Sequence, residues 1–136
     1  MSQKVYLVSA CLLGLCTRYD AQLKQSKDCI LALKDHIAIP ICPEQLGGLP
    51  TPRPPADVVG GTGSDVLSGK AKVLTKDGVD LSQEFIQGAQ QTLKIAQMHT
   101  VEAVYLKSRS PSCGVHEKLG VTTALLQQAG YSIKEF

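Results

Sequence analysis

Four short runs of apolar and β-branched residues are expected to form the strands of this protein. Residues 5–10 read VYLVSA and residues 37–42 read IAIPIC, and both are almost uninterrupted apolar runs. Residues 101–108 (VEAVYLKS) and 131–133 (YSI) are two further candidates. Short apolar runs of this kind are typical of strands in a sheet that is buried on both faces.

Helical periodicity is clearest over residues 80–98 (DLSQEFIQGAQQTLKIAQM). Asp80 is a candidate N-cap, with Gln83 three residues further on, as in a capping box. Apolar residues recur at helical spacing and predict one buried face, formed by Phe85, Ala89, Leu93 and Ala96.

Two shorter segments have helix signals at one end. Ser26 can cap a helix over residues 26–36, and Gly130 can end a helix over residues 120–130. Strands that alternate with helices predict a parallel sheet with helices on both faces. We therefore expect an α/β fold, a single Rossmann-like domain over residues 1–136 with a small parallel sheet, flanking helices and a long Gly/Pro-rich loop.

That loop is expected between residues 40 and 69. Twelve of the 19 Gly and Pro residues of the chain fall in this stretch, which holds only four charged residues. Gly and Pro at this density interrupt regular structure, so we expect an ordered loop rather than helix or sheet. A long, stiff and weakly charged loop is more often the wall of a functional site than a spacer.

Charge limits the classes of partner. The 136 residues carry 14 Lys and Arg against 12 Asp and Glu, a formal net charge of +2, without a basic stripe. Nucleic-acid binding relies on many cationic contacts to phosphate, so tRNA is not favoured as a partner. No apolar run reaches the roughly 18–20 residues of a membrane span, and no membrane partner is expected. The N-terminal apolar stretch runs into Arg18, Tyr19 and Asp20 without a cleavage-site pattern, so we expect a strand and a cytoplasmic protein.

Three of the five cysteines occupy comparable places. Cys11, Cys42 and Cys113 each follow a predicted strand and have Gly or Pro nearby. The carboxyl ends of parallel strands share one edge of a sheet, where ligands bind, so we expect these three thiols to converge. Cys29 lies in an amphipathic helix and is expected to be a small buried hydrophobic residue.

The residue types leave the chemistry of such a site open. Three thiolates and His116, in a Cys-x-x-His pattern with Cys113, would suit a closed structural zinc site. Three thiolates alone would suit an iron–sulfur cluster with one iron left open, which acts as a Lewis acid. A third alternative is a metal-free persulfide carrier that uses Cys16 or Cys113.

Five segments, in order, resemble the thiouracil desulfurase family: SACLLGLCTRYD, ICPEQLGGLPTPRPPADVVGG, GKAKVLTKDGVDLSQEFIQGA, VYLKSRSPSCG and GVTTALL. The resemblance covers nearly the whole chain. It differs from the usual pattern at Ala21, where the family usually has Gly, and in a shorter link over residues 115–119.

The resemblance implies a [4Fe-4S] cluster held by Cys11, Cys42 and Cys113. It also implies a non-redox desulfidation in which the open iron takes the sulfur of a thiolated pyrimidine. The products would be the oxo-pyrimidine and hydrogen sulfide. Whether Cys16 is a fourth ligand matters, because a fourth ligand would close the open iron.

Two side chains are expected to handle protons. Glu44 is the only carboxylate adjacent to an expected ligand, and we expect it to activate water. The resemblance favours Ser110 as the second catalytic residue, and Ser112 alternatively only hydrogen-bonds the turn.

The expected substrate is a small molecule, either a thiolated base such as 2- or 4-thiouracil or a thiouridine nucleotide. Arg53 and Lys107 or Arg109 are candidates to meet a phosphate. The alternative for each of these cations is a solvated or structural ion pair.

Overall fold

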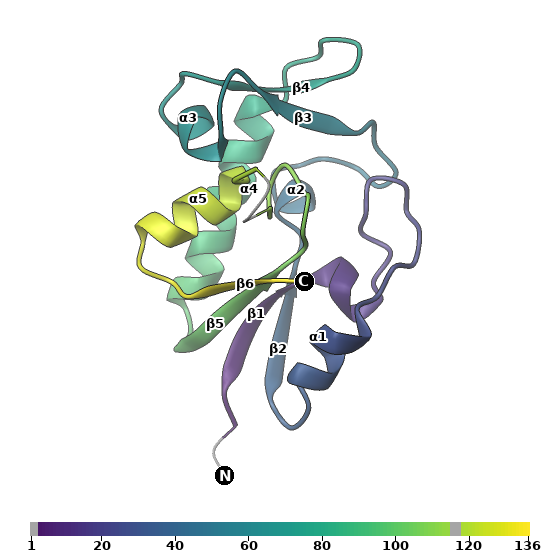
Figure 1. Cartoon of the computed structure of the whole chain (residues 1–136), viewed down its shortest axis with the longest axis vertical. Coiled ribbons are helices and arrows are strands. Elements are labelled where there is room, and N and C mark those ends of the chain that lie inside the picture. The colour runs from purple at the N-terminus through teal and green to yellow at the C-terminus, as the bar shows by residue number, and fades with distance from the viewer. Residues whose placement is uncertain (1–2, 115–117) are drawn as a thin grey trace.

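The computed structural model of the chain describes residues 3–114 and 118–136 (Figure 1). Its strands are β1 (Val5–Ser9), β2 (Ile37–Ile41), β3 (Ala56–Val59), β4 (Lys72–Thr75), β5 (Val101–Leu106) and β6 (Ile133–Glu135). Its helices are the 3-10 helix η1 (Ala10–Leu13), α1 (Lys27–Ala32), α2 (Pro43–Leu46), α3 (Gly63–Leu67), α4 (Ser82–Gln97) and α5 (Val121–Gln128). None of the helices in the described ranges is both long and apolar enough to cross a membrane.

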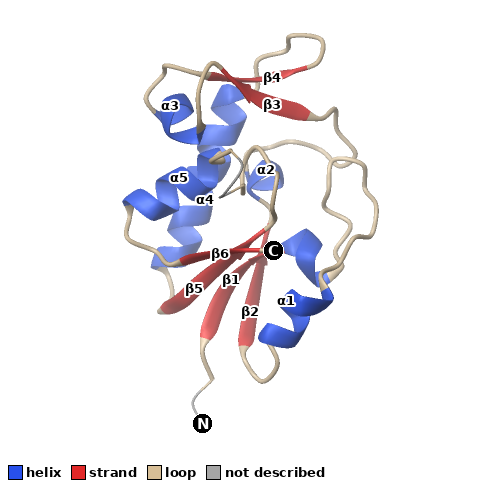
Figure 2. Cartoon of the chain, in the orientation of Figure 1, coloured by secondary structure: helices blue, strands red, loops and turns tan. Residues whose placement is uncertain are grey.

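A parallel sheet with strand order β2-β1-β5-β6 organises the fold. Alternate residues of β1 face opposite sides, so Leu7 packs in one core while Tyr6 and Val8 pack in another. Helices α4 and α5 supply the first core through Ala96 and Leu126, and α1 covers the opposite face (Figure 2). The expected α/β fold with a parallel sheet between helices is confirmed.

The expectation of an irregular loop over residues 40–69 is wrong, because α2, β3 and α3 lie within it. Strand β3 pairs antiparallel with β4, and this two-stranded sheet lies beyond the carboxyl ends of β1 and β2 (Figure 1). Helix α3 connects its two strands, and Thr62 and Asp65 form a capping box at the start of that helix. A third core, including Val58, Val73 and Phe85, fixes the two-stranded sheet against α4.

The predicted helix ends are partly confirmed. Ser26 caps α1 by accepting a hydrogen bond from the backbone N–H of Cys29 at 3.1 Å. Gly130 follows α5 with φ of 92°, which an L-residue rarely adopts. The capping box predicted at Asp80 is wrong, because α4 begins two residues later. The Asp80 carboxylate instead accepts the N–H of Ser82, the first helical residue, at 2.9 Å.

Close packing of α2 on α4 places the segment that follows β2. A Cβ atom at Gly47 would overlap the Glu84 carbonyl oxygen, and one at Gly88 would overlap the Pro43 carbonyl oxygen. Only glycine allows two helix backbones to approach this closely. The pair therefore fixes α2, and with it Cys42 at its N-cap and Glu44 in its first turn.

Candidate active site

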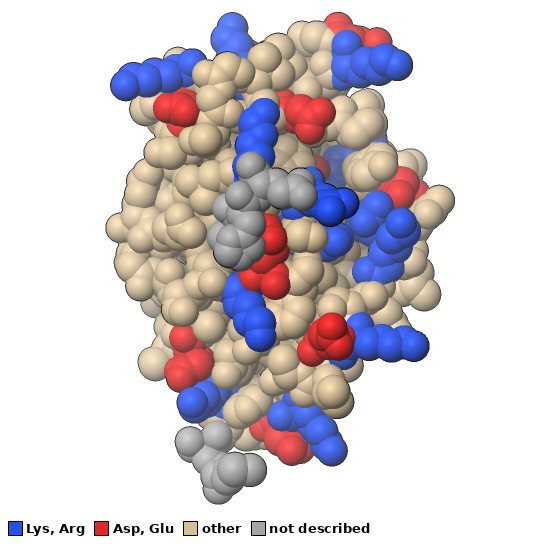
Figure 3. Space-filling model, in the orientation of Figure 1, with Lys and Arg blue, Asp and Glu red and all other residues tan. Residues whose placement is uncertain are grey.

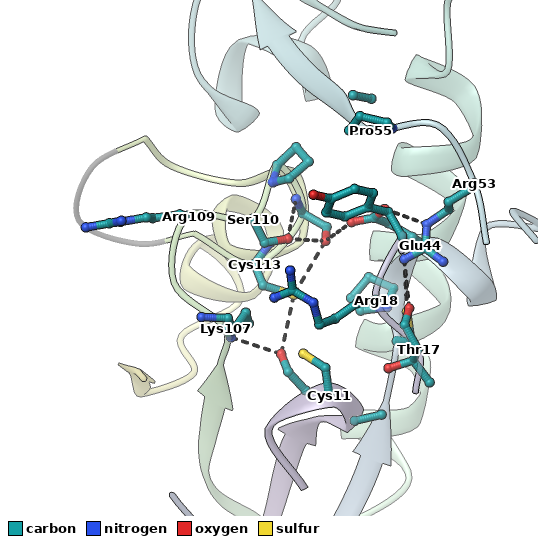
Figure 4. Close-up of a pocket in the computed structure, with 18 of the residues that line it drawn as sticks. Cys11, Thr17, Arg18, Glu44, Arg53, Pro55, Lys107, Arg109, Ser110 and Cys113 are labelled. Carbon is teal, nitrogen blue, oxygen red and sulfur yellow. Dashed lines mark hydrogen bonds and ion pairs between the residues drawn. The ribbon is translucent and has the colours of Figure 1, made fainter. Parts of the chain in front are cut away.

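Cys11, Cys42 and Cys113 converge as expected. Cys11 lies in η1 directly after β1, Cys42 follows β2, and Cys113 lies in the loop after β5. All three line one cavity of about 380 Å³ (Figure 4). The remaining wall comes from the loop that contains Arg18 and Tyr19, from the segment that leads into β3, and from residues 107–112.

Cys113 is the most enclosed of the three thiols. It is buried, and burial raises the pKa of its thiol to about 12, although its hydrogen bonds with Ser112 and Ser9 partly oppose the shift. The Ser9 hydroxyl accepts the Lys107 N–H at 3.1 Å and donates to the Cys113 Sγ at 3.5 Å. Sequence reasoning missed Ser9, whose contact joins residues 104 positions apart.

The other two thiols are half-buried beside each other. Burial, followed by the neighbouring Cys42, raises the pKa of Cys11, whereas the nearby Lys107 and Arg18 lower it. The Cys42 Sγ lies 3.8 Å from the Thr17 carbonyl oxygen. Burial thus favours the neutral thiol of Cys11.

The donor set fits an iron–sulfur cluster better than a single ion. Zinc needs its thiolates at about 2.3 Å from one centre, and in the described residues no group of three or more His, Cys, Asp or Glu side chains could hold one metal ion. A cluster binds each cysteine to a different iron, so its ligands stand further apart. The His116 of the zinc alternative lies outside the described residues.

Glu44 faces the cavity and is fixed on both sides. Its Oε1 accepts a hydrogen bond from Arg53 Nε at 2.9 Å, and its Oε2 accepts one from Ser112 Oγ at 3.1 Å. The ion pair with Arg53 is largely buried, with 14% of the Glu44 side chain and 5% of the Arg53 side chain exposed. The carboxylate is therefore held in one orientation, as Figure 4 shows.

Arg53 uses every N–H of its guanidinium inside the protein. Besides Glu44, it donates to the Pro50 carbonyl oxygen at 3.2 Å and the Thr51 hydroxyl at 2.8 Å through Nη1. Through Nη2 it donates to the Thr17 carbonyl oxygen at 2.9 Å and the Cys42 Sγ at 3.9 Å. An Arg side chain has five N–H donors, so none is left for a phosphate. The structural ion pair is thus the correct alternative for Arg53.

Ser110 and Ser112 form a directed chain of hydroxyls. The Ser110 Oγ accepts the backbone N–H groups of Ser112 and Cys113, each at 3.2 Å, which occupies both of its acceptor positions. Its own hydrogen is therefore donated, and the Ser112 Oγ lies 2.9 Å away. Because Ser112 in turn donates to Glu44, the hydroxyl hydrogens point from Ser110 through Ser112 to the carboxylate.

Helix α5 anchors the loop that carries these residues. The N–H of Val121 donates to the Pro111 carbonyl oxygen at 3.0 Å, and the N–H of Thr122 donates to that of Ser112 at 2.9 Å. A Cβ atom at Gly120 would overlap the Ser112 backbone, so glycine is required there. The free amides at the start of α5 thus hold the loop in place.

Known proteins resemble this chain over nearly its whole length. The family described as 2-thiouracil desulfurase matches residues 6–135. The chain belongs to the 2-thiouracil desulfurase family. It is 42% identical over 139 residues to the protein YbbK of Bacillus subtilis (strain 168), covering 93% of this chain and 92% of that one. A solved structure described as the [4Fe-4S]-dependent thiouracil desulfidase TudS matches with a TM-score of 0.77 and 35% identity, covering 98% of this chain and 91% of that one.

Membership of the 2-thiouracil desulfurase family confirms the resemblance seen in the sequence, and with it an enzyme of this kind. The persulfide alternative has little support, because Cys113 is buried with a raised pKa and a reactive thiol is accessible with a lowered one. Cys16 is exposed and is not among the residues that line the cavity. Cys29 is fully buried in the core under α1, as expected.

The other two cations considered for a phosphate also lie at the cavity. Lys107 lines it and donates from Nζ to the Ser108 hydroxyl at 3.3 Å, and Arg109 also lines it. Figure 3 shows Lys and Arg side chains interspersed with Asp and Glu over the face in view, without a continuous basic surface there.

Proposed function

We propose that this chain hydrolyses the C=S bond of a small thiolated pyrimidine, giving the oxo-pyrimidine and hydrogen sulfide without net redox change. The observation that carries the proposal is the convergence of three thiols and a Glu44–Ser112–Ser110 hydrogen-bond chain on one cavity. The likeness to TudS, described as a [4Fe-4S]-dependent thiouracil desulfidase, supports it.

Cys11, Cys42 and Cys113 are the proposed ligands of a [4Fe-4S] cluster. When bound, the cluster supplies an iron without a protein ligand, a Lewis acid matched to a soft thiocarbonyl sulfur. The Ser9 and Ser112 hydroxyls, each 3.5 Å from the Cys113 sulfur, orient that ligand. Arg53 does the same for Cys42.

Glu44 is the proposed general base. It takes one proton from a water molecule, whose oxygen forms a bond to the thiolated carbon. As the C–S bond breaks, the second proton of that water passes from the new hydroxyl group to the sulfur, which leaves the C=O group and HS⁻. The proton held by Glu44 then completes hydrogen sulfide. Sulfur leaves at the same oxidation level it had in the substrate, so no electron donor is needed. The ion pair with Arg53 holds the carboxylate in a fixed orientation, which a base requires before substrate arrives.

Ser112 and Ser110 are proposed to return that proton. Protonation of Glu44 reverses the direction of these bonds, because the acid can donate where the carboxylate only accepted. Both hydroxyls rotate, so that Glu44 donates to Ser112 and Ser112 donates to Ser110 in place of one backbone N–H group. Each hydrogen then shifts by one bond along the reversed chain, and Ser110 gives its own hydrogen to the departing sulfur or a ring nitrogen. Ser110 is the catalytic member of the chain, and Ser112 connects it to Glu44.

The substrate is proposed to be a free base or nucleotide rather than tRNA. The cavity has a volume of about 380 Å³, the size of a small-molecule site, and the chain carries a net charge of only +2. Of the three cations considered for a substrate phosphate, Lys107 and Arg109 stay candidates, whereas Arg53 does not, because its donors are all in use. The proposal takes residues 1–136 as one desulfurase domain that works in the cytoplasm, where its free cysteines stay reduced.

The test is anaerobic reconstitution with iron and sulfide, followed by assay of 2- and 4-thiouracil. Wild type and Cys16→Ala should each bind about four irons and release sulfide from substrate, whereas Cys113→Ala should lose the cluster. Glu44→Gln should keep its iron and lose turnover by roughly 100-fold or more. Full turnover by Glu44→Gln, or loss of iron from Cys16→Ala, would contradict the proposed mechanism.

A further inference from the structure

Tyr19 differs from the other aromatic residues of the chain in what surrounds it. The chain has four Tyr, two Phe and no Trp. Five of these six side chains pack into the hydrophobic cores: Tyr6, Phe85, Tyr105, Tyr131 and Phe136. Tyr19 is 41% exposed and lines the cavity of the candidate active site.

The backbone around Tyr19 is held against the buried Arg53. The Tyr19 carbonyl oxygen accepts the Arg53 backbone N–H at 2.8 Å, and the Thr17 carbonyl oxygen accepts its Nη2 at 2.9 Å. These two bonds hold the loop on either side of Arg18. An exposed aromatic residue on a free loop would need no explanation. The backbone of Tyr19, however, is hydrogen-bonded to Arg53, which orients the Glu44 carboxylate.

Arg18 further restricts the tyrosine ring. Its guanidinium carbon lies 5.7 Å from the centre of the Tyr19 ring, within range of a cation–π contact. Asp20 holds the guanidinium in turn, through Nε at 3.2 Å and Nη2 at 3.3 Å. Figure 4 shows the Arg18 side chain reaching into the cavity. The ring is therefore positioned before a ligand arrives.

We propose that Tyr19 is the aromatic wall against which the pyrimidine ring of the substrate stacks. This inference rests on the proposed function, because it requires a planar pyrimidine in the cavity. Among the residues that the structure describes, the other wall residues supply thiols, hydroxyls, charges and aliphatic or proline carbons, and none of them has an aromatic face. Stacking a base on an aromatic side chain contributes about 1–3 kcal/mol, enough to select a planar ring.

Two inhibitors separate stacking from the other contacts. Uracil and 5,6-dihydrouracil present the same amide edge, but only uracil is a flat conjugated ring. Tyr19→Ser should weaken uracil binding to cluster-loaded protein roughly 5- to 100-fold and change dihydrouracil binding less than about threefold. Tyr19→Phe should bind uracil within about threefold of wild type, because the ring face is kept.

Calorimetric binding of uracil and the kinetics of thiouracil turnover are measured on the same variants. The KM of Tyr19→Ser should rise while kcat changes little, since the variant keeps every proton-transfer group. Leu23→Ala is the matched control, an exposed apolar residue of the same loop that does not line the cavity. Its uracil binding should equal that of wild type.

The outcomes separate this inference from the proposed function. Thiouracil turnover by wild type, with equal uracil binding by wild type and Tyr19→Ser, overturns the stacking role and leaves the desulfidase proposal intact. Weaker uracil binding by Tyr19→Ser supports the stacking role even if no thiolated base is converted. Equal losses for uracil and dihydrouracil overturn it, and absence of uracil binding to wild type overturns it together with the substrate assignment.

Discussion

The Oε2 atom of Glu44 accepts a hydrogen bond from the Ser112 hydroxyl at 3.1 Å, which joins two segments 68 residues apart in the sequence. Ser112 also lies 3.5 Å from the Cys113 sulfur and 2.9 Å from the Ser110 hydroxyl. One buried hydroxyl therefore contacts the proposed base, a proposed cluster ligand and the proposed proton donor. Removing it separates these groups without removing any of them.

Ser112→Ala is expected to keep the cluster and lose turnover. The kcat should fall roughly 10- to 100-fold, because Ser110 loses its connection to Glu44, while KM changes less than about threefold. Iron content and thermal melting identify any general damage. Ser68→Ala, which removes a hydroxyl that bonds only locally in the α3 turn, is the control. A Ser112→Ala enzyme with wild-type kcat would show that the hydroxyl chain carries no proton.

Arg53→Lys is expected to impair both stability and activity, because an ammonium group cannot reproduce five directed N–H donors. Arg53→Met should cost more, about 3–5 kcal/mol, since it leaves a buried carboxylate without its counter-charge. Denaturant unfolding measures both variants. Lys4→Met, at the exposed Lys4–Glu102 pair, should change stability far less than either Arg53 variant, because solvent screens that pair. Equal effects at the two pairs would contradict the role given to Arg53.

The convergence of the three cysteines could be predicted because it depends on one rule. Cys11, Cys42 and Cys113 each follow a parallel strand, and parallel strands end at the same edge of a sheet. The order β2-β1-β5 places the three strand ends side by side at that edge. Ser26 and Gly130 were predictable for a similar reason, because capping depends on residues close in sequence.

The features that could not be predicted depend mostly on contacts between residues far apart in the sequence. Strand β3 forms because residues 56–59 pair with residues 72–75. The density of Gly and Pro in residues 40–69 does not reveal that pairing. The capping box of Thr62 and Asp65 was a local signal that could have located α3. Arg53 was expected to be a phosphate ligand or an ion pair, and only the folded chain shows all its donors in use.

The buried thiol of Cys29 is expected to make the protein less stable at alkaline pH. Burial raises the pKa of its thiol from 9.0 to about 11, so the unfolded chain loses this proton at lower pH than the folded chain. Stability is then complete below about pH 9 and declines as pH rises toward 11. Denaturant unfolding of metal-free protein between pH 8 and 11 should show a shallower decline for Cys29→Val than for wild type. Parallel declines would show that Cys29 does not contribute.

Ala21 occupies a left-handed backbone conformation, with φ of 59°. Its N–H donates to the Arg18 carbonyl oxygen at 2.9 Å and closes the turn that contains Tyr19. A Cβ atom in this conformation costs roughly 1–2 kcal/mol, which glycine avoids, although glycine also gains entropy in the unfolded chain. Ala21→Gly should therefore raise the free energy of unfolding by about 0.5–1 kcal/mol. Ala32→Gly, at an exposed helical position of α1, should lower it by a similar amount, and a loss at both positions would refute the strain assigned to Ala21.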